Sequence, residues 1–405
     1  MNIWLFSKTL MPVIQTFIDY NREIYQTWAL IRTEWGTAFD EFNTSLASVD
    51  LSVITDDVEA LGETLDNVLG KDRSATLVDF LSDLGMSIAR EYGKLPQDVA
   101  SAFYQMASAT MEYEDIADTA ILAAKASIAG VTDLTTAMDA GIQAAYAFGT
   151  EMSRLDEIYD LQFQTVKYGI LRYKELADVM GRVYQPAASL SESLVNMQEM
   201  YATIAFATRV GLSPEMAGFG MGRLYESFSD TRVVENLKKI NVEVFDSIGN
   251  FRGLYAIVKD IVFTIKGFST SVSQTILSNL GFDMRARRVL RSLITNFAAY
   301  TQLIDDFGKD IEGSMSKAFE TMTESFSFKV DQFKATWETL KISISEASID
   351  TLTYFIDNLS FGLKAMIGWL QEGVLYINNF SVSIGSIVKY SATFFMLFAV
   401  IATFA

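Results

Sequence analysis

The scarcity of helix-breaking residues most strongly constrains the fold of this chain. Only four of its 405 residues are proline, and they stand far apart, at Pro12, Pro96, Pro186 and Pro214. Proline inside a helix removes a backbone hydrogen bond and clashes with the preceding turn, so its rarity leaves long stretches in which helices can form. Half of the residues are hydrophobic, which is enough to bury sizeable cores. The sequence therefore predicts a mainly α protein.

The charge balance argues against nucleic acid as a general partner. Asp and Glu number 50 against 32 Lys and Arg, a formal net charge of −18, and this excess opposes approach to a phosphate backbone. One basic cluster follows Gly281 and consists of Arg285, Arg287, Arg288 and Arg291. Their spacing of three and four residues places them on one broad face of a predicted helix. We expect a solvated helix face there and no specific nucleic-acid binding.

The chain contains neither histidine nor cysteine. Their absence excludes Ser-His-Asp and Cys-His nucleophilic catalysis, and it also excludes histidine and thiolate metal sites. Two carboxylates in a cleft would suffice for a glycosidase, but no pair stands out among 50 acidic residues. We therefore predict that the chain is not an enzyme and has no catalytic residue, no cofactor, no cofactor-binding residue and no metal ligand.

Four glycines divide the middle of the chain at intervals of 37, 39 and 42 residues: Gly93, Gly130, Gly169 and Gly211. Each follows a predicted helix, which indicates a repeat of about 40 residues. We expect each glycine to end its helix in the left-handed conformation. Thr132 or Asp133, and Ser213 with Pro214, are suited to begin the next helix. Helical hairpins that stack in this way form elongated repeats, because each buries the apolar stripe of its neighbour.

The segment 233–262 predicts an interruption of the helical pattern. β-Branched and aromatic residues run from Val242 to Phe245 and again from Phe251 to Val258, and the sequence DSIGN lies between them. This turn chemistry between two hydrophobic runs predicts a strand, a tight turn at Gly249 and a second strand. We therefore expect one short β-hairpin insertion.

Residues 314–360 contain no glycine and no proline. Large apolar residues recur there at intervals of three and four, close to the period of a coiled-coil seam: Phe319, Met322, Phe326, Val330, Phe333, Trp337, Leu340 and Ile344. A single helix of this length would extend ~70 Å at ~1.5 Å per residue. We expect a long C-terminal helix whose exposed seam favours self-association. The alternative is an amphipathic helix packed on the core.

The last segment, Ser391 to Ala405, carries no charged residue. As a helix it would extend ~22 Å, less than the ~30 Å hydrocarbon layer of a membrane. Two interpretations have equal support: a membrane span that the given sequence truncates, and a buried hairpin helix.

Three of these features, in this order, resemble the core of phage tail tape measure proteins, a family of long-tailed phages and prophages. Residues 205–224, AFATRVGLSPEMAGFGMGRL, are similar to the family's Ala-rich helix, glycine, Ser-x-Glu start and second helix. The interruption at 233–262 is similar to the family's short strand, Asp, Gly and following hydrophobic segment. The family's Trp-bearing helix after the core is matched by Val330, Asp331, Phe333, Lys334, Trp337 and Leu340. The resemblance covers roughly residues 74–350, and it departs after Gly169, where no Ser or Thr begins the next helix.

The patterns and the resemblance together divide the chain into six parts. We expect an N-terminal helical segment over 1–73, a helical-repeat core over 74–232, the strand-turn-strand insertion over 233–262 and a helical segment over 263–312. A long amphipathic helix region over 313–379 follows, and a hydrophobic segment over 380–405 is the candidate truncated membrane span.

The resemblance implies a virion structural protein that sets tail length as a helical ruler during tube assembly, because each helical residue adds a fixed rise. It also implies the tail tube protein, tail assembly chaperones and tail tip proteins as partners, together with a homo-oligomer of the chain itself. The implied locations are the host cytoplasm during assembly and the lumen of the virion tail. During genome ejection the apolar segment near Ser391 is expected to enter the host membrane.

Two other classes of function compete with this interpretation. A membrane-active helical protein unrelated to tails, of the pore-forming or effector type, would also combine an acidic body with an apolar segment. A muralytic carboxylate hydrolase fused to a helical scaffold is the second alternative, although no compact lysozyme-like segment occurs in the sequence.

Overall fold

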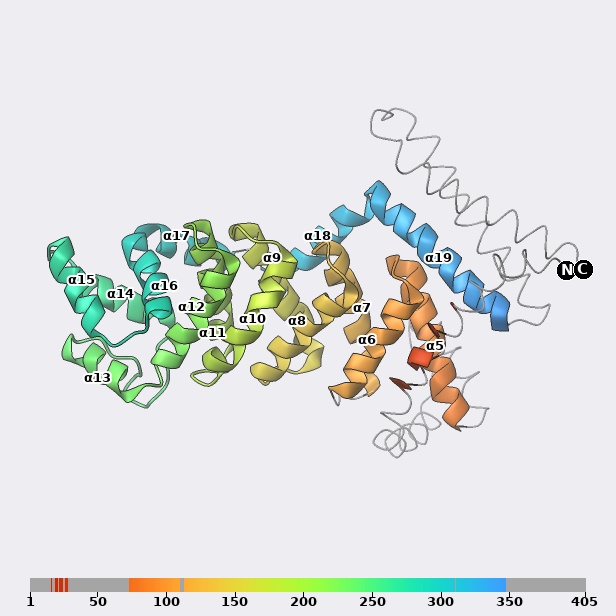
Figure 1. Cartoon of the computed structure of the whole chain (residues 1–405), viewed down its shortest axis with the longest axis horizontal. Helices are drawn as coiled ribbons and strands as arrows, with labels where there is room; N and C mark the ends of the chain where they lie inside the picture. Colours follow the sequence, from red (N-terminus) through yellow and green to blue (C-terminus); the bar gives the residue numbers. More distant parts are fainter. Residues whose placement is uncertain are drawn as a thin grey trace, which may run out of the picture. The chain divides into compact units, whose positions relative to one another are not determined.

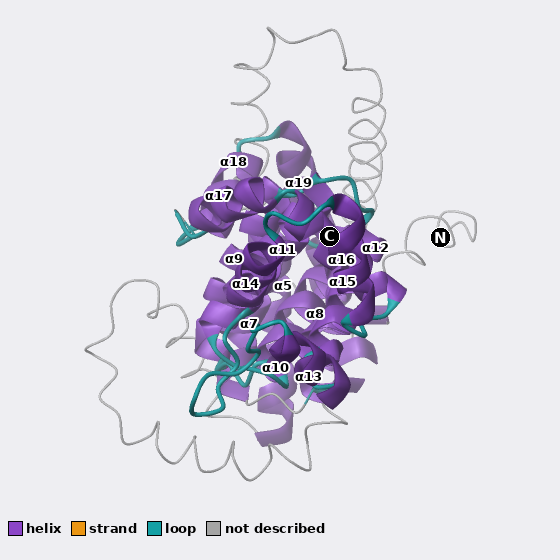
Figure 2. Ribbon diagram, turned by 90° about the vertical axis from the view of Figure 1, so that its left-hand side faces the viewer, coloured by secondary structure: helices purple, strands orange, loops and turns teal. Residues whose placement is uncertain are grey.

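The computed structural model describes residues 73–109, 113–309 and 311–346, together with residues 16, 19, 20, 22–24, 26 and 27. This described part is helical and contains no β-strand, which confirms the predicted mainly α fold (Figure 2). The chain divides into two compact units. Unit 1 contains the described residues of Met1–Tyr113 and Ser325–Ala405, and unit 2 contains those of Glu114–Glu324.

Unit 1 is built around α5 (Arg73–Tyr92), α6 (Pro96–Ser108) and α19 (Phe326–Glu346). Helix α19 packs against both α5 and α6. The turn after α5 approaches α19 closely, because a Cβ atom at Gly93 would lie 2.8 Å from the backbone nitrogen of Gln332. The side-chain amide of Gln332 donates a hydrogen bond of 2.8 Å to the carbonyl oxygen of Glu91.

The predicted single helix from Ser314 onward is wrong, because the chain breaks it at residues 324–325. Helix α18 (Ser314–Thr323) ends there and belongs to unit 2, whereas α19 starts at Phe326 in unit 1. Ser325 explains the new start, since its hydroxyl accepts a hydrogen bond of 3.2 Å from the backbone N–H of Phe328. The predicted exposed seam is wrong at Trp337 and Leu340, which are buried within unit 1. The earlier seam residues are half-buried: Phe319, Met322, Phe326, Val330 and Phe333.

Unit 2 arranges its helices as two packed rows (Figure 1). The first row contains α8 (Leu134–Ala147), α10 (Tyr173–Ala188), α12 (Pro214–Ser227) and α16 (Met284–Thr295), each in contact with the next. The second row contains α9 (Leu155–Tyr168), α11 (Leu194–Arg209) and α17 (Phe297–Phe307), with α18 packed on α9. The remaining elements are α7 (Tyr113–Ala129), the 3-10 helix η3 (Met152–Arg154), α13 (Thr231–Lys239), α14 (Leu254–Ile265) and α15 (Thr270–Asn279).

The predicted helical-hairpin repeat is present within unit 2. Gly130, Gly169 and Gly211 each lie in the turn after a helix, and the next helices start at Leu134, Tyr173 and Pro214. The expected caps form at two of these starts. The Asp133 carboxylate accepts a hydrogen bond of 2.7 Å from the backbone N–H of Thr136, and the Ser213 hydroxyl accepts one of 3.3 Å from Met216.

The expected left-handed conformation is wrong for two of the four glycines. Gly93 and Gly211 have φ of 63° and 102°, but beside Gly130 it is Val131 that has a positive φ, and Gly169 has φ of −94°. Close packing explains the glycines there. A Cβ atom at Gly130 would lie 2.7 Å from the ring of Tyr173, and one at Gly169 would lie 2.9 Å from the hydroxyl of Thr208.

The predicted β-hairpin does not form, although its turn does. The backbone N–H of Asp246 donates to the carbonyl oxygen of Asn250 at 2.8 Å, and Gly249 has φ of 91°. Pairing is limited to an isolated bridge between Phe245 and Phe251. The expected second strand is replaced by α14, because its apolar residues recur at helical spacing and are buried: Leu254, Ile257, Val258 and Ile261.

The predicted segment Ser391–Ala405 lies outside the described residues. Among those the structure describes, no helix combines the length and the hydrophobicity needed to cross a membrane. The six predicted domain boundaries stay a prediction.

Candidate functional site

The carboxylates of the described residues do not assemble a metal site. No group of three Asp or Glu side chains is placed to hold an ion in the part of the chain that the structure describes. The polar residues that are brought together there cap helices, fill the core of unit 2 or lie on its surface.

A buried polar network joins four helices of unit 2 around Gln162. The amide of Gln162 donates hydrogen bonds of 3.0 Å to the carbonyl oxygen of Ala140 and 3.2 Å to the hydroxyl of Tyr201. Its amide oxygen accepts a hydrogen bond from the hydroxyl of Tyr173. The hydroxyls of Tyr184 and Tyr201 lie 2.9 Å apart. Burial raises the pKa of Tyr201 to about 12, so the phenols stay neutral and the network fixes how α8, α9, α10 and α11 align.

Helix α14 begins without a local cap, and a carboxylate from α11 takes that role. The N-cap residue is Gly253, with φ of 88° and no side chain to accept the first N–H groups. The half-buried Glu199 accepts hydrogen bonds from the backbone N–H groups of Tyr255 and Leu254. Burial raises the pKa of Glu199 to about 7, although these N–H groups act in the opposite direction. A Cβ atom at Gly253 would lie 2.6 Å from a Glu199 carboxylate oxygen, so this position requires glycine.

Helix α18 receives a cap from a distant residue in the same way. The N-cap residue is Gly313, which offers no side chain. Asp160 of α9 is buried, and its carboxylate accepts hydrogen bonds of 2.7 Å from the backbone N–H of Gly313 and 2.8 Å from that of Met315. Burial raises the pKa of Asp160, while these two N–H groups act to lower it. The contact fixes α18 to α9 across about 150 residues of sequence.

Helix α12 lies in close contact with both neighbours of its row through glycines. On the side of α10, a Cβ atom at Gly218 would lie 2.6 Å from the Cβ of Val179, and one at Gly222 would lie 2.6 Å from the carbonyl oxygen of Arg182. On the side of α16, a Cβ atom at Gly220 would lie 2.9 Å from the carbonyl oxygen of Arg285. The three helix axes are therefore drawn together at this point.

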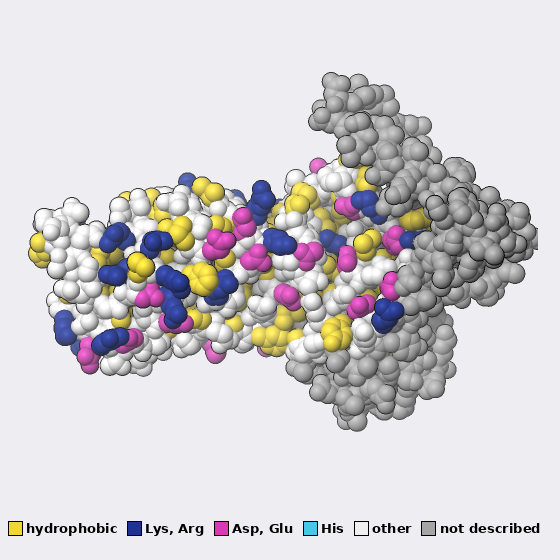
Figure 3. Space-filling model, in the orientation of Figure 1, with side chains coloured by type: hydrophobic (Ala, Val, Ile, Leu, Met, Phe, Trp, Pro, Cys, Tyr) yellow, Lys and Arg dark blue, Asp and Glu magenta, His cyan; other side chains and the backbone are white. Residues whose placement is uncertain are grey.

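Between these glycines, Phe219 projects from α12 with two arginines against its ring. The guanidinium carbons of Arg182 and Arg285 lie 4.3 and 5.2 Å from the ring centroid, within cation–π range. Arg288, one turn after Arg285, donates a hydrogen bond of 3.0 Å to the sulfur of Met216. Figure 3 shows the resulting group of basic side chains with hydrophobic ones between them, over α12 and α16.

The predicted arginine face is divided by the structure. All four arginines lie on α16, as expected, and Asp283 caps this helix by accepting a hydrogen bond of 2.8 Å from Ala286. Arg285 and Arg288 contact side chains of α12, whereas Arg287 is half-buried and Arg291 is exposed. The face is thus partly a contact surface with α12 and partly solvated.

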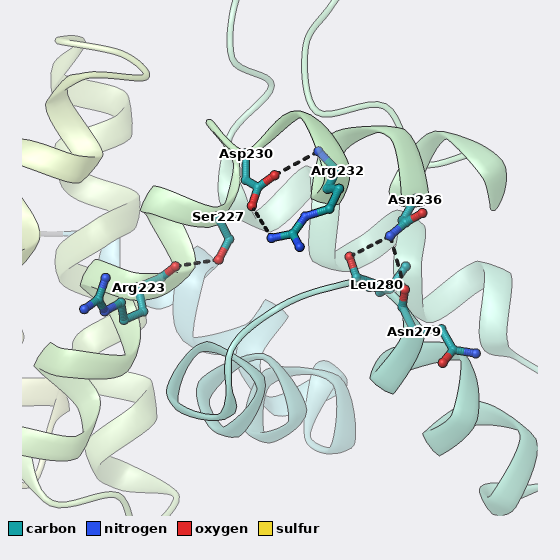
Figure 4. A network of polar contacts seen from close by, with 7 residues as sticks. All are labelled: Arg223, Ser227, Asp230, Arg232, Asn236, Asn279 and Leu280. Atoms are coloured by element: carbon teal, nitrogen blue, oxygen red, sulfur yellow. Dashed lines mark hydrogen bonds and ion pairs between the residues drawn. The ribbon is translucent and has the colours of Figure 1, made fainter.

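A second polar network joins α13 to the turn before α16 (Figure 4). Asp230 caps α13 by accepting a hydrogen bond of 2.9 Å from the backbone N–H of Arg232, whose guanidinium also pairs with it at 3.0 Å. The amide of Asn236 donates to the carbonyl oxygens of Asn279 and Leu280 at 3.3 and 3.4 Å. The contacts of Asn236 hold α13 against the end of α15 and the turn before α16.

The fold and these contacts define a helical-repeat protein whose described polar residues stabilise helices and form surfaces. Residues 82–281, just under half of the chain, match the family of phage-related minor tail proteins. This match supports a phage tail protein with a structural role in the virion tail and with other tail components as partners. Comparison with curated proteins gave no match, and comparison with solved structures gave none either.

Proposed function

We propose that this chain is a tail tape measure protein that sets tail length during tube assembly. The match of residues 82–281 to a phage tail family carries the proposal. Support also comes from the order of elements, in which helical hairpins precede the Asp246–Asn250 turn and the Trp337 helix follows. This role requires helices and binding surfaces and no catalytic residue, in agreement with a chain that lacks histidine and cysteine.

The proposed partners are the tail tube protein, tail assembly chaperones and tail tip proteins, and the proposed location is the lumen of the tail. Membrane entry during genome ejection is part of the same proposal and is assigned to the segment from Ser391.

The ruler segment is best tested with residues that do not belong to a described helix. Helices α18 and α19 are each packed against other helices of their own unit, so removing them would damage the unit as well as shorten the chain. Residues 347–379 complete the predicted long amphipathic region, and their deletion removes no residue of a described helix.

Tail length in the phage that encodes the chain tests the proposal. An in-frame deletion of residues 347–379 should shorten the tail by about 50 Å, and a duplication should lengthen it by the same amount, at ~1.5 Å per helical residue. A control that replaces the segment with an unrelated helix-forming sequence of equal length should restore the original tail. Tails of unchanged length in both the deletion and the duplication would refute the ruler role of this segment. Virions that lack the protein, together with liposome binding by the purified chain, would favour the membrane-active alternative.

A further inference from the structure

Residues 230–280 form a segment that the rest of unit 2 holds mainly through α14. Helices α13, α14 and α15 lie in this segment, at one end of unit 2 (Figure 1). Helix α14 packs on α11 and α16, whereas α13 and α15 make few contacts with other helices. Polar contacts also occur within the segment, such as the ion pair of Arg252 with Asp260 at 2.8 Å. Such a segment can open locally while the remaining helices of unit 2 stay folded.

Two side chains from outside the segment bind it with hydrogen bonds. Glu199 of α11 accepts hydrogen bonds from the backbone N–H groups of Leu254 and Tyr255 at the start of α14. The hydroxyls of Tyr255 and Thr301 lie 3.2 Å apart. No other side-chain hydrogen bond joins the segment to the described helices around it. Of the two outside side chains, Glu199 is the one that ionises, so its charge can control how firmly α14 is held.

The surroundings of Glu199 provide no positive charge. No charged side chain of the described helices that pack on α11 interacts with this carboxylate, and Arg252 beside the cap is already paired with Asp260. The titratable groups that face it are the phenols of Tyr225 on α12 and Tyr300 on α17. Burial first, and then the charge of Glu199, raise the pKa of both phenols, so they stay neutral. The buried hydroxyl of Tyr225 has no hydrogen-bond partner among the described residues.

We propose that Glu199 acts as a pH-dependent latch: its neutral form holds residues 230–280 on α11, and its ionised form releases them. A buried carboxylate without a cation carries a desolvation penalty, which opening removes because the group returns to water. Burial raises the pKa of Glu199 from 4.5 to about 7 in the closed state. The latch is therefore complete below pH 4.5 and is lost as the pH rises through 7. The proposal is independent of the ruler role, because it concerns local opening of the purified chain and not tail length.

Hydrogen–deuterium exchange of the full chain, followed by mass spectrometry between pH 5 and 7.5, tests the latch. After correction for the intrinsic pH dependence of exchange, the equilibrium constant for opening of residues 230–280 should rise about fiftyfold over this range. Helices α8 to α11 should show no such rise, because they stay folded when the segment opens. Glu199→Gln keeps an acceptor oxygen and the side-chain volume but cannot ionise, so its opening constant should not change with pH.

Asp230→Asn is the matched control within the same segment. Asp230 caps α13, and hydrogen bonds from Arg232 lower its pKa, so it stays ionised over the whole pH range. This variant should keep the wild-type rise. An equal rise in the wild type and in Glu199→Gln overturns the proposal, and so does a rise shared by α8 to α11, because the whole unit would then be opening. Absence of the rise in the wild type overturns it even if Glu199→Gln does not fold.

Discussion

Replacing Gly222 with alanine tests how closely α12 packs against α10. In an exposed helix the change from glycine to alanine stabilises by about 1 kcal/mol. At Gly222 the added Cβ would lie 2.6 Å from the carbonyl oxygen of Arg182, a backbone atom that cannot rotate away. Ordinary contact begins at 3.4 Å, so the helices would have to separate by up to about 0.8 Å. Overpacking of this kind costs about 1–3 kcal/mol, so after the gain of about 1 kcal/mol we expect a net loss of up to about 2 kcal/mol.

Gly181→Ala supplies the matched control within the same pair of helices. Gly181 is exposed on α10, and a Cβ there would meet the end of the Gln143 side chain at 3.2 Å, which can move aside. We expect this variant to be as stable as the wild type or more stable by up to about 1 kcal/mol. Guanidinium unfolding followed by far-UV circular dichroism measures the free energy of unfolding of both variants. In thermal unfolding, each kcal/mol corresponds to about 2–4 °C in Tm for a unit of this size. A Gly222→Ala variant as stable as Gly181→Ala would refute the close contact of α10 with α12.

Three further variants test the buried polar contacts of unit 2 by chemical denaturation. Because the folded pKa of Glu199 is about 7, above the ordinary 4.5, its contribution to stability is complete below pH 4.5 and is lost as the pH rises through 7. The free energy of unfolding of the wild type should therefore fall by up to about 3 kcal/mol as the pH rises from 4.5 through 7. Glu199→Gln should lack this fall, and an unchanged pH profile in the variant would contradict the assignment. Asp160→Ala leaves two N–H groups of α18 without their acceptor and should cost about 2–4 kcal/mol, whereas Asp156→Ala on the exposed first turn of α9 should cost a few tenths. Gln162→Leu leaves the hydroxyls of Tyr173 and Tyr201 without their amide partner and should cost about 2–3 kcal/mol, and a stable variant would show that the network contributes little.

The helical content and the repeat could be predicted from the sequence because both depend on local properties. Turns near Gly130, Gly169 and Gly211 and the caps Asp133 and Ser213 follow from residues that are adjacent along the chain. The neighbouring sequence does not show which atoms of the folded unit require a glycine at each of these positions. At Gly169 a Cβ atom would meet the local atoms of Leu171 and Thr165 and also the hydroxyl of Thr208, which comes from α11 and is close only in the folded unit.

The error at residues 251–258 has a similar cause. The run from Phe251 to Val258 is rich in residues that favour strands, and the preceding turn forms as expected. Helix α14 forms instead of the predicted strand because Glu199 supplies the missing cap and because four apolar residues at helical spacing are buried. The sequence does contain a weak signal for this contact. Both α14 and α18 begin after a glycine and have no Ser, Thr, Asp or Asn at the N-cap, which indicates a cap from elsewhere in the chain.

These distant caps also bear on where a length-setting segment can lie. Asp160 fixes the start of α18 to α9, and Glu199 fixes the start of α14 to α11, so the ends of these helices are set by contacts within unit 2. Deleting one turn inside such a helix would break a cap or expose apolar residues before it changed the length of the unit by the deleted rise. A segment in which length follows residue number must lack cross-contacts of this kind, since only then does each residue add its ~1.5 Å independently. Under the proposed ruler role, changes within unit 2 are for this reason expected to affect tails only through loss of the folded protein.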